Sequence, residues 1–298
     1  MLIDVDSSIP NLALMKISAY LKQSGYEVGF NVPDPDIIYA SCIFPRNKHK
    51  TDGLTSFYPN IPIDIGGSGI DLHKSLSPEI DLICPDYSLY PDCDMDLGFT
   101  TRGCIRNCPF CIVPSKEGKF RRVQHPREFH DPSHKKMMLL DNNILADKEW
   151  FMEITDWMIQ NKLRISFNQG IDARLIDQDI AERIKQIKTF EEWRVAMDTL
   201  SVKDKVVKGI RMLQDAGMDT KHKLICYVYI NDNSEFESAL NRCNTLRELN
   251  VTPYVMLNQN VKFDGIVKLL RRWTQPMVFY KFTFQEYLDL RTAENKVY

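Results

Sequence analysis

The stretch TRGCIRNCPFC, from Thr101 to Cys111, holds three of the chain's eight cysteines, at positions 104, 108 and 111. Three thiolates so close together can bind a metal centre and leave one coordination position open for a ligand. An open position is what chemistry at a metal requires, whereas four protein ligands are typical of a structural site. The stretch therefore predicts a reactive metal centre held by Cys104, Cys108 and Cys111, which we take as the catalytic residues.

Two other uses of these cysteines are a disulfide framework and a structural zinc site. The first residues, Met1–Asp6, show neither a basic nor an apolar leader region, so we expect a cytoplasmic protein in a reducing compartment, where disulfides are rare. A zinc site closed by His125, His130 or His134 stays open as an alternative and would make the chain a non-catalytic binding module. The cysteine spacing speaks against zinc, because zinc sites usually combine two short pairs of ligands.

Composition sets wider limits. The 298 residues, 44% of them hydrophobic, are enough for one large barrel or for two domains with a sizeable core. The 38 basic and 40 acidic residues give a net charge of −2, so nothing global recruits nucleic acid or an anionic membrane. No apolar run approaches the ~18 residues that a membrane helix needs. The sequence predicts a soluble globular protein.

Residues 1–92 show the alternation of a small parallel α/β domain of Rossmann type. A helix is predicted from Asn11 to Ser24, closed by Gly25. The predicted strands are short and apolar: 2–5, 26–30, 36–40, 61–65 and 81–84. The glycine-rich loop 66–69 follows the fourth of them, where a ligand or another backbone can approach closely. Residues 85–96, with their prolines and acidic side chains, are expected to link this domain to the next.

Residues 93–298 alternate in longer units. The predicted strands are 97–101, 136–140, 165–168, 194–197, 223–229 and 252–257, with helices between them that begin at Asp147, at Ser201 and at a capping box of Ser234 and Glu237. Six such units are too few to close an eight-fold barrel. The closing stretch 267–298 is expected to cover the open side or the bottom of the incomplete barrel that these units would form.

Polar side chains follow every strand predicted in residues 93–298. They are the cysteine stretch itself, then 141–143, 168–174, Asp198, 229–232 and 258–260. Parallel barrels carry their chemistry at the carboxyl ends of the strands, so these residues predict one polar cup.

The cysteine spacing, with the aromatic Phe110 before the last cysteine, resembles the radical S-adenosylmethionine (SAM) superfamily. Three further runs are similar to a widespread subgroup whose N-terminal domain is related to cobalamin-binding domains: PDYSLYP at 85–91, LLDNN at 139–143 and FNQG at 167–170. The resemblance covers most of the chain. It implies a partial (β/α)6 TIM-like barrel over residues 93–298, preceded by the Rossmann-like domain over 1–92.

By this resemblance, Cys104, Cys108 and Cys111 hold three irons of a [4Fe–4S] cluster, and the fourth iron takes the amino and carboxylate groups of SAM. The implied SAM contacts are Phe110 at the adenine, Asp141, Asn142 and Asn143 at the methionine amino group, Gln169 or Arg174 at the carboxylate, Asp198 at the ribose, and Tyr229 and Asn258 beside the nucleoside. The Gly-Gly-Glu motif that is usual at the amino-group position is absent.

The resemblance also implies a reaction. An electron from a flavodoxin- or ferredoxin-type donor cleaves SAM reductively, and the resulting 5′-deoxyadenosyl radical abstracts hydrogen from a substrate that the sequence does not identify. The basic residues Lys116, Lys119, Arg121 and Arg122 could receive an acidic donor or an anionic substrate, or form a solvated loop.

Cobalamin is possible but not favoured. The loop after the first predicted strand, 6–11, lacks the Asp-x-His-x-x-Gly pattern that supplies an axial histidine, and Asp71-Leu72-His73 is only a partial match. We therefore expect a degenerate domain, with a cobalamin-dependent radical SAM methyltransferase as the alternative. A methylthiotransferase would need a second cluster on three N-terminal cysteines, for which Cys42, Cys84 and Cys93 are poorly placed.

Overall fold

The computed structural model describes residues 1–294, and the chain divides into two compact units. The first unit contains residues 1–107 and 111–141, and the second contains 108–110 and the chain from 142 onward. The domain boundary expected at 92/93 falls inside the first unit, and the division into functional domains stays a prediction. The last residues of the expected closing stretch, 295–298, lie outside the described part. No helix in residues 1–294 is long and apolar enough to cross a membrane.

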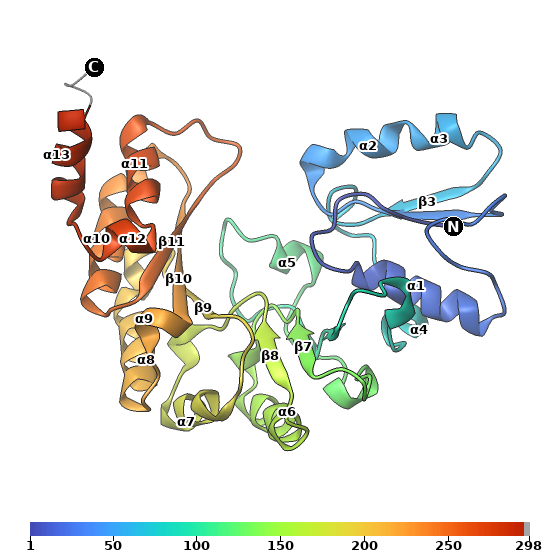
Figure 1. Cartoon of the computed structure of the whole chain (residues 1–298), viewed down its shortest axis with the longest axis horizontal. Helices are drawn as coiled ribbons and strands as arrows, with labels where there is room; N and C mark the ends of the chain where they lie inside the picture. Colours follow the sequence, from blue (N-terminus) through green and yellow to red (C-terminus); the bar gives the residue numbers. More distant parts are fainter. Residues whose placement is uncertain (295–298) are drawn as a thin grey trace. The chain divides into compact units, whose positions relative to one another are not determined.

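The first unit begins with a parallel sheet of three strands in the order β1-β2-β3, formed by Leu2–Asp4, Ile38–Ser41 and Ile63–Gly66. Helix α1 (Leu12–Gln23) lies within the predicted range and is capped by Asn11, whose side chain accepts from the Leu14 N–H. Short helices complete the unit's front part: η1 (Pro45–Asn47), α2 (His49–Asp52), α3 (Leu54–Phe57) and α4 (Pro78–Asp81). Helices α1 and α4 lie on one face of the sheet and α2 and α3 on the other (Figure 1).

Two of the five strands predicted in residues 1–92 are wrong. Residues 26–30 form no strand. The Gly29 carbonyl accepts a hydrogen bond from the Leu2 N–H, but the nearby Pro33 and Pro35 lack the N–H groups that would continue a ladder. At 81–84 the chain is leaving helix α4, which starts at Pro78, a residue favoured in the first turn of a helix. The Rossmann-type prediction is thus reduced to three parallel strands, and nothing in this sheet supports a cobalamin-binding domain.

The rest of the first unit leads to the cysteine stretch. Its elements are η2 (Tyr87–Leu89), β4 (Met95–Gly98), β5 (Thr101–Arg102), α5 (Val113–Lys116), β6 (Arg121–Arg122), η3 (Pro126–Glu128) and β7 (Lys136–Leu139). Strand β4 pairs in parallel with β7, and β5 pairs antiparallel with β6. The expected linker therefore ends inside a strand, and Asp96 is fully buried there.

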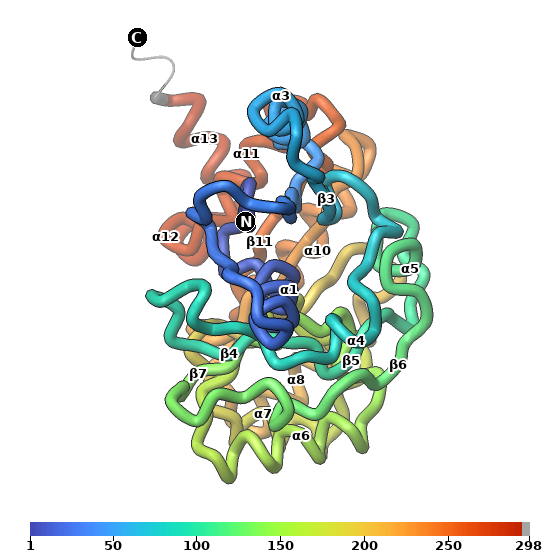
Figure 2. Tube along the Cα trace, turned by 90° about the vertical axis from the view of Figure 1, so that its right-hand side faces the viewer, coloured from blue at the N-terminus to red at the C-terminus, as the bar shows by residue number. Residues whose placement is uncertain are grey.

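The second unit continues the alternation of strands and helices. Its strands are β8 (Arg164–Phe167), β9 (Trp193–Ala196), β10 (Leu224–Ile230) and β11 (Thr252–Leu257). Its helices are η4 (Ile144–Ala146), α6 (Lys148–Gln160), η5 (Ala173–Leu175), α7 (Gln178–Gln186), η6 (Leu200–Val202), α8 (Lys203–Asp215), α9 (Thr220–Lys223), η7 (Asn233–Glu235), α10 (Phe236–Glu248), α11 (Gly265–Trp273), α12 (Pro276–Phe279) and α13 (Phe284–Glu294). Helices α6, α7 and α8 follow one another along one side of this unit (Figure 2).

Strands β9, β10 and β11 form a parallel sheet in the order β11-β10-β9. Alternate residues of β10 are buried, from Leu224 to Ile230, whereas Ile225, Tyr227 and Tyr229 are half-buried on the other face. This alternation is typical of a sheet covered by helices on one side only. The site residue Tyr229 therefore lies on the face opposite the buried core.

The six strands predicted in residues 93–298 are all present, and β11 has the predicted bounds. The first is divided, because the chain turns between β4 and β5. The helix start at Asp147 is confirmed, but the capping box of Ser234 and Glu237 is wrong, since Asp232 accepts from the Ser234 N–H instead. The two units are mixed α/β with parallel sheets, no closed barrel is present in residues 1–294, and the partial barrel stays a prediction.

Candidate functional site

The cysteine loop starts at a tight turn after β5. Gly103 has φ +77°, and a Cβ atom built there would lie 2.3 Å from the Lys119 carbonyl oxygen. Only glycine combines this backbone conformation with so close an approach. Position 103 therefore brings the first cysteine, Cys104, next to Lys119, with which it forms an isolated parallel bridge just before β6.

Arg102 anchors the base of the loop. Its guanidinium group donates to Asp81 at 2.8 Å and to Glu117 at 3.1 Å, and its charge lies 3.9 Å from the centre of the Phe99 ring. Two carboxylates and an aromatic face hold the planar cation more firmly than one surface ion pair does. These contacts hold in place the backbone from which the cysteine loop starts.

Asp141 belongs to the same base. Its buried carboxylate accepts from the Thr100 hydroxyl at 2.7 Å, the Thr101 hydroxyl at 2.6 Å, and the backbone N–H groups of both threonines. Burial raises the pKa of Asp141, and the hydrogen bonds from the two threonines oppose that rise. The carboxylate expected at the methionine amino group is therefore occupied in shaping the turn before Cys104.

The thiols of Cys104 and Cys111 accept hydrogen bonds from the backbone. The Arg106 N–H donates to Cys104 Sγ at 3.3 Å, and the Val113 N–H donates to Cys111 Sγ at 3.4 Å. Hydrogen bonds of this kind favour the thiolate and tune the potential of a bound iron–sulfur cluster. Cys104 is half-buried and Cys111 is exposed. The donor set fits an iron–sulfur cluster in its chemistry.

The cysteines are divided between the units, with Cys104 and Cys111 in the first and Cys108 in the second. In residues 1–294 no group of three or more His, Cys, Asp or Glu side chains is arranged to hold a metal ion. Convergence of the three thiols therefore stays a prediction.

In the second unit, the aromatic residue of the cysteine stretch meets the end of β10. The rings of Phe110 and Tyr229 are stacked, with centroids 4.7 Å apart and planes 30° apart. The Tyr229 N–H donates to the Asp198 carboxylate at 3.2 Å. Burial raises the pKa of Asp198, and the Tyr229 N–H and the charges of Arg242 and Arg174 counteract the rise. Three predicted nucleoside contacts thus lie together.

Arg174 is close enough to this group for the charges of Cys108 and Asp198 to act on it. Its guanidinium group is held by Asp172 through two hydrogen bonds, of 2.6 and 2.9 Å, which raise the pKa of Arg174. Asp172 also accepts from the buried Asn143 side chain at 3.3 Å. Asp172 thus orients two residues predicted to bind the methionine part of SAM.

The remaining predicted residues are less constrained. Asn258 follows β11, and its side chain donates to Asn231 at 3.1 Å beside the end of β10. Gln169 is exposed on the turn after β8, and Asn142 is half-buried. Gly170 has φ +78° and a Cβ there would lie 2.7 Å from the Arg194 carbonyl oxygen, which explains the glycine of the FNQG run.

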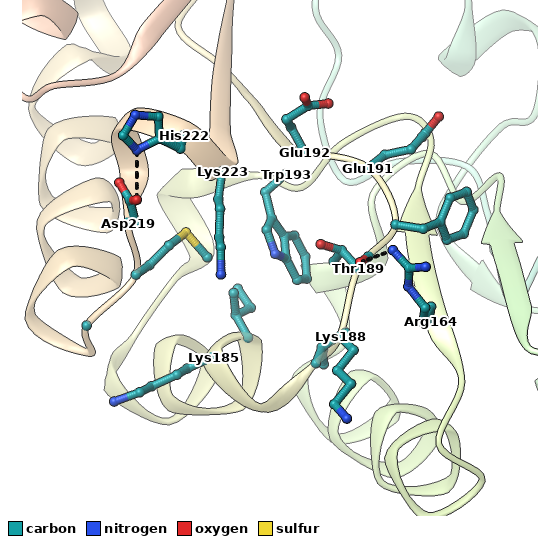
Figure 3. Close-up of a pocket in the computed structure, with 15 residues that line it drawn as sticks. Arg164, Lys185, Lys188, Thr189, Glu191, Glu192, Trp193, Asp219, His222 and Lys223 are labelled. Atoms are coloured by element: carbon teal, nitrogen blue, oxygen red, sulfur yellow. Dashed lines mark hydrogen bonds and ion pairs between the residues drawn. The ribbon is translucent and has the colours of Figure 1, made fainter.

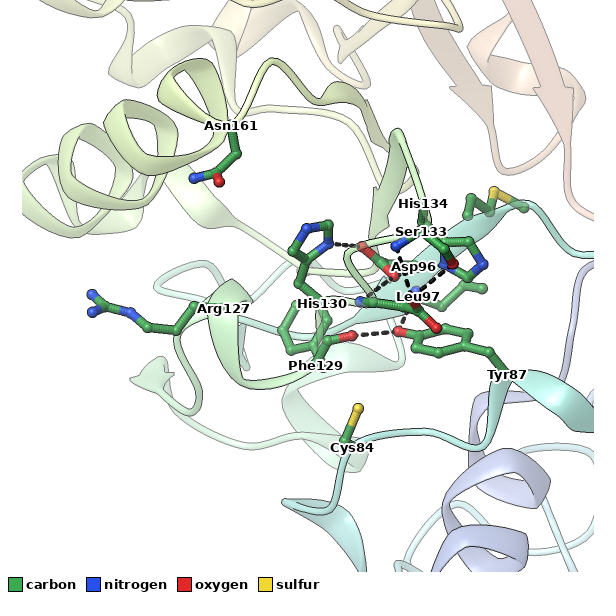
Figure 4. Close-up of polar contacts among 12 residues, drawn as sticks. Cys84, Tyr87, Asp96, Leu97, Arg127, Phe129, His130, Ser133, His134 and Asn161 are labelled. Carbon is green, nitrogen blue, oxygen red and sulfur yellow. Dashed lines mark hydrogen bonds and ion pairs between the residues drawn. The ribbon is translucent and has the colours of Figure 1, made fainter.

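The three histidines weighed for a zinc site have other partners. Nδ1 of His130 lies 2.6 Å, and Nδ1 of His134 2.8 Å, from the two carboxylate oxygens of buried Asp96, with the rings on opposite sides of it (Figure 4). His125 accepts from the Arg127 backbone and side chain. The contacts of His130 and His134 fasten the segment 125–134 to β4, the contacts of His125 are local to the segment, and all of them favour a structural role for the histidines.

A cavity of about 680 Å³ lies at the opposite end of the strands, next to the start of β8, β9 and β10. Its lining includes Trp193 and several basic side chains, but the ammonium groups of Lys185 and Lys188 extend in different directions (Figure 3). No predicted site residue lines it. It offers no convergent polar groups of the kind that orient a ligand.

One residue beside the site was missed by the sequence analysis. Arg242 lies on α10, is fully buried, and donates to the carbonyl oxygens of Met197 and Tyr229. A signal was present: helical periodicity places position 242 on the face that also carries Ala239, Cys243 and Leu246, where an apolar residue is expected.

Comparison with protein-family models and with curated proteins finds no match. Among solved structures, a double mutant of spore photoproduct lyase with bound AdoMet and dinucleoside spore photoproduct is 10% identical, aligns over 81% of this chain and 83% of that chain, and gives a TM-score of 0.38. A single mutant of the same lyase is 13% identical over the same shares, with a TM-score of 0.37. Similarity at this level establishes neither the fold nor the function.

Proposed function

We propose that the chain is a radical SAM enzyme that acts on a substrate still to be identified. The proposal is carried by one observation: Phe110, the residue just before the third cysteine of the motif, stacks on Tyr229 next to Asp198 at the carboxyl end of a parallel strand. The cysteine motif and the predicted nucleoside contacts, which are far apart in sequence, are thus connected by a direct contact. The carboxyl ends of the strands are where parallel α/β barrels carry their chemistry.

In this proposal Cys104, Cys108 and Cys111 would bind a [4Fe–4S] cluster, and the cluster, when bound, supplies the electron that cleaves SAM reductively. The protein's part is to bind and orient the nucleotide. Phe110 and Tyr229 would contact the adenine, and Asp198 would accept from a ribose hydroxyl. Backbone N–H groups at 106 and 113 would stabilise the thiolates, as their hydrogen bonds support.

We assign the methionine part of SAM to fewer residues than the sequence suggested. Asn142, Asn143 and Arg174, with Gln169 nearby in sequence, would meet its amino and carboxylate groups, and Asp172 would hold two of them in place. Asp141 is proposed to shape the loop instead, because its carboxylate already accepts from two hydroxyls and two backbone N–H groups.

An acidic electron donor of the flavodoxin or ferredoxin type is proposed to dock beside the cysteine loop, in the cytoplasm. Lys119, Arg121 and Arg122 are exposed on the β5–β6 side of the loop, and Ile105 and Ile112 expose 50% and 51% of their surface within it. Exposed apolar and basic side chains in neighbouring parts of the chain suit a weak, electrostatically guided contact.

Cobalamin is not proposed as a cofactor. Ligands of parallel α/β sheets bind beyond the carboxyl ends of the strands. Here the Asp6 carboxylate after β1 accepts from the N–H groups of Ile43 and Phe44, and the Gly69 N–H donates to the Cys42 carbonyl. A Cβ atom at Gly67 or Gly69 would lie within 3 Å of the Cys42 or Phe44 backbone, so the chain's own backbone fills the space beside these two glycines. When the full chain is titrated with hydroxocobalamin, the visible spectrum of the cobalamin should stay that of the free compound.

Anaerobic reconstitution with iron and sulfide tests the main proposal. We expect about four irons per chain, visible absorption, and formation of 5′-deoxyadenosine from SAM on reduction. All three should be lost in Cys108→Ala and retained in Cys84→Ser, which changes an exposed cysteine outside the motif. A colourless protein that carries zinc, or a Cys108→Ala variant that keeps the iron, would refute the proposal.

A further inference from the structure

We propose that Arg242 is a positioning residue for the nucleoside site, which clamps the carboxyl ends of β9 and β10 from inside the core and so sets the placement of Asp198 and Tyr229. The inference rests on the proposed function and adds a residue that the cysteine motif gives no reason to suspect.

The first observation is where the guanidinium group donates. Nη1 of Arg242 donates to the Met197 carbonyl at 2.9 Å and to the Tyr229 carbonyl at 3.1 Å, and Nε donates to the Ser238 carbonyl at 3.2 Å. One nitrogen thus bridges the two strand ends. Met197 precedes Asp198 directly, so both bridged positions lie at or next to predicted nucleoside contacts.

The second observation is that the sheet ladder stops at this point. The paired register of β9 and β10 ends at Ala196 and Tyr227, followed by one bond from the Met197 N–H to the Tyr227 carbonyl. If the parallel ladder continued, the Tyr229 N–H would donate to the Met197 carbonyl. Instead the Tyr229 N–H donates to Asp198 and the Met197 carbonyl accepts from Arg242. The two side chains replace a ladder bond and hold the strands apart at the site.

The third observation is the chemical nature of the residue. Arg242 is fully buried, yet its hydrogen bonds go to carbonyl groups and not to carboxylates. Burying a cation in this way costs more free energy than burying a methionine of similar length. Packing alone does not account for it. The positive charge acts on Asp198 and favours its ionised form, the form that accepts hydrogen bonds from hydroxyl groups.

The test uses full-length reconstituted protein and two probes, S-adenosylhomocysteine and its 2′,3′-dideoxy analogue, measured by calorimetry. In the wild type we expect the analogue to bind about tenfold more weakly, because Asp198 loses its ribose partner. In Arg242→Met we expect weaker binding of the parent compound and a penalty for the analogue of less than about threefold, since the two changes remove the same interaction. Arg242→Lys should recover part of both effects.

Leu246→Ala is the control, because Leu246 is also fully buried on α10 and its truncation destabilises the core without touching the strand ends. It should lower the melting temperature and leave the analogue penalty at the wild-type value. Amide exchange at 197–199 and 227–231 should be faster in Arg242→Met than in Leu246→Ala at equal stability. An unchanged penalty in Arg242→Met overturns the inference alone. A wild type that binds neither probe overturns the proposed function, and the inference with it.

Discussion

The ring of Phe110 lies against the ring of Tyr229, with centroids 4.7 Å apart, although 119 positions separate the two residues in sequence (229 − 110). Phe110 keeps 39% of its surface exposed. Part of the ring is therefore left uncovered by the protein. The remaining face is available for a planar group, which is how an adenine would be held.

Phe110→Ala should therefore weaken SAM binding and leave the iron content unchanged. Aromatic stacking contributes about 0.5–1.5 kcal/mol beyond area burial, which predicts a loss of affinity of roughly two- to twelvefold. Calorimetry on reconstituted protein measures it. Phe57→Ala serves as the control, because that ring is 80% exposed in the first unit and should not affect binding. Equal affinities for the two variants would argue against an adenine contact at Phe110.

Asp141→Asn should lower stability, because the carboxylate accepts from the hydroxyl and N–H groups of both Thr100 and Thr101. An amide turns one acceptor into a donor facing those groups, at a cost of about 1–3 kcal/mol for each buried group left unpaired. Urea unfolding compares it with Gln169→Ala, an exposed position where we expect no change. Were Asp141→Asn as stable as the wild type but deficient in SAM binding, a ligand role would be supported instead.

Most of the strands and several helix starts could be predicted from sequence, because they depend on local chemistry. The run 252–257 contains β-branched and aromatic residues and is followed by the polar residues 258–260, and it forms β11 with the predicted bounds. Asn11 and Asp147 cap helices because their side chains reach the N–H three residues on. The wrong strands at 26–30 and 81–84 show a short apolar run overruled by neighbouring prolines.

Positions in the candidate site were predictable only where they follow strand ends, and their roles stay a proposal. Asp198 and Tyr229 could be placed because each closes a strand, but the structural use of Asp141 depends on threonines about forty positions earlier. Arg242 acts through carbonyl groups of two other segments. Such contacts form only when the strands are assembled, so helical periodicity marks position 242 as buried but does not reveal which groups Arg242 meets.

Asp96 and its two histidines should be more important for stability than an exposed histidine pair. Asp96 is fully buried between His130 and His134, whereas His222 and Asp219 form an exposed pair at 2.8 Å. We expect Asp96→Ala to cost about 3–5 kcal/mol, as for breaking a buried pair by removing one partner, and Asp219→Ala to have a much smaller effect. Thermal and urea unfolding measure both. Similar costs for the two variants would show that the buried cluster does not fasten segment 125–134.

Asp6 gives a prediction for pH. Partial burial acts to raise the pKa of Asp6, but hydrogen bonds from the Ile43 N–H, the Asn47 side chain and the Phe44 N–H outweigh it and hold the pKa below its usual value. Because the folded-state pKa is lowered, the unfolded chain binds the proton first, so the stabilisation is present above about pH 4 and is lost as pH falls through the folded-state value. Asp6→Asn should be less stable than the wild type by about 1–2 kcal/mol at pH 7. That difference should stay constant from pH 5 to 8 and shrink below about pH 4 in urea unfolding curves. A difference that grows toward acid pH would contradict the assignment of these donors to the ionised carboxylate.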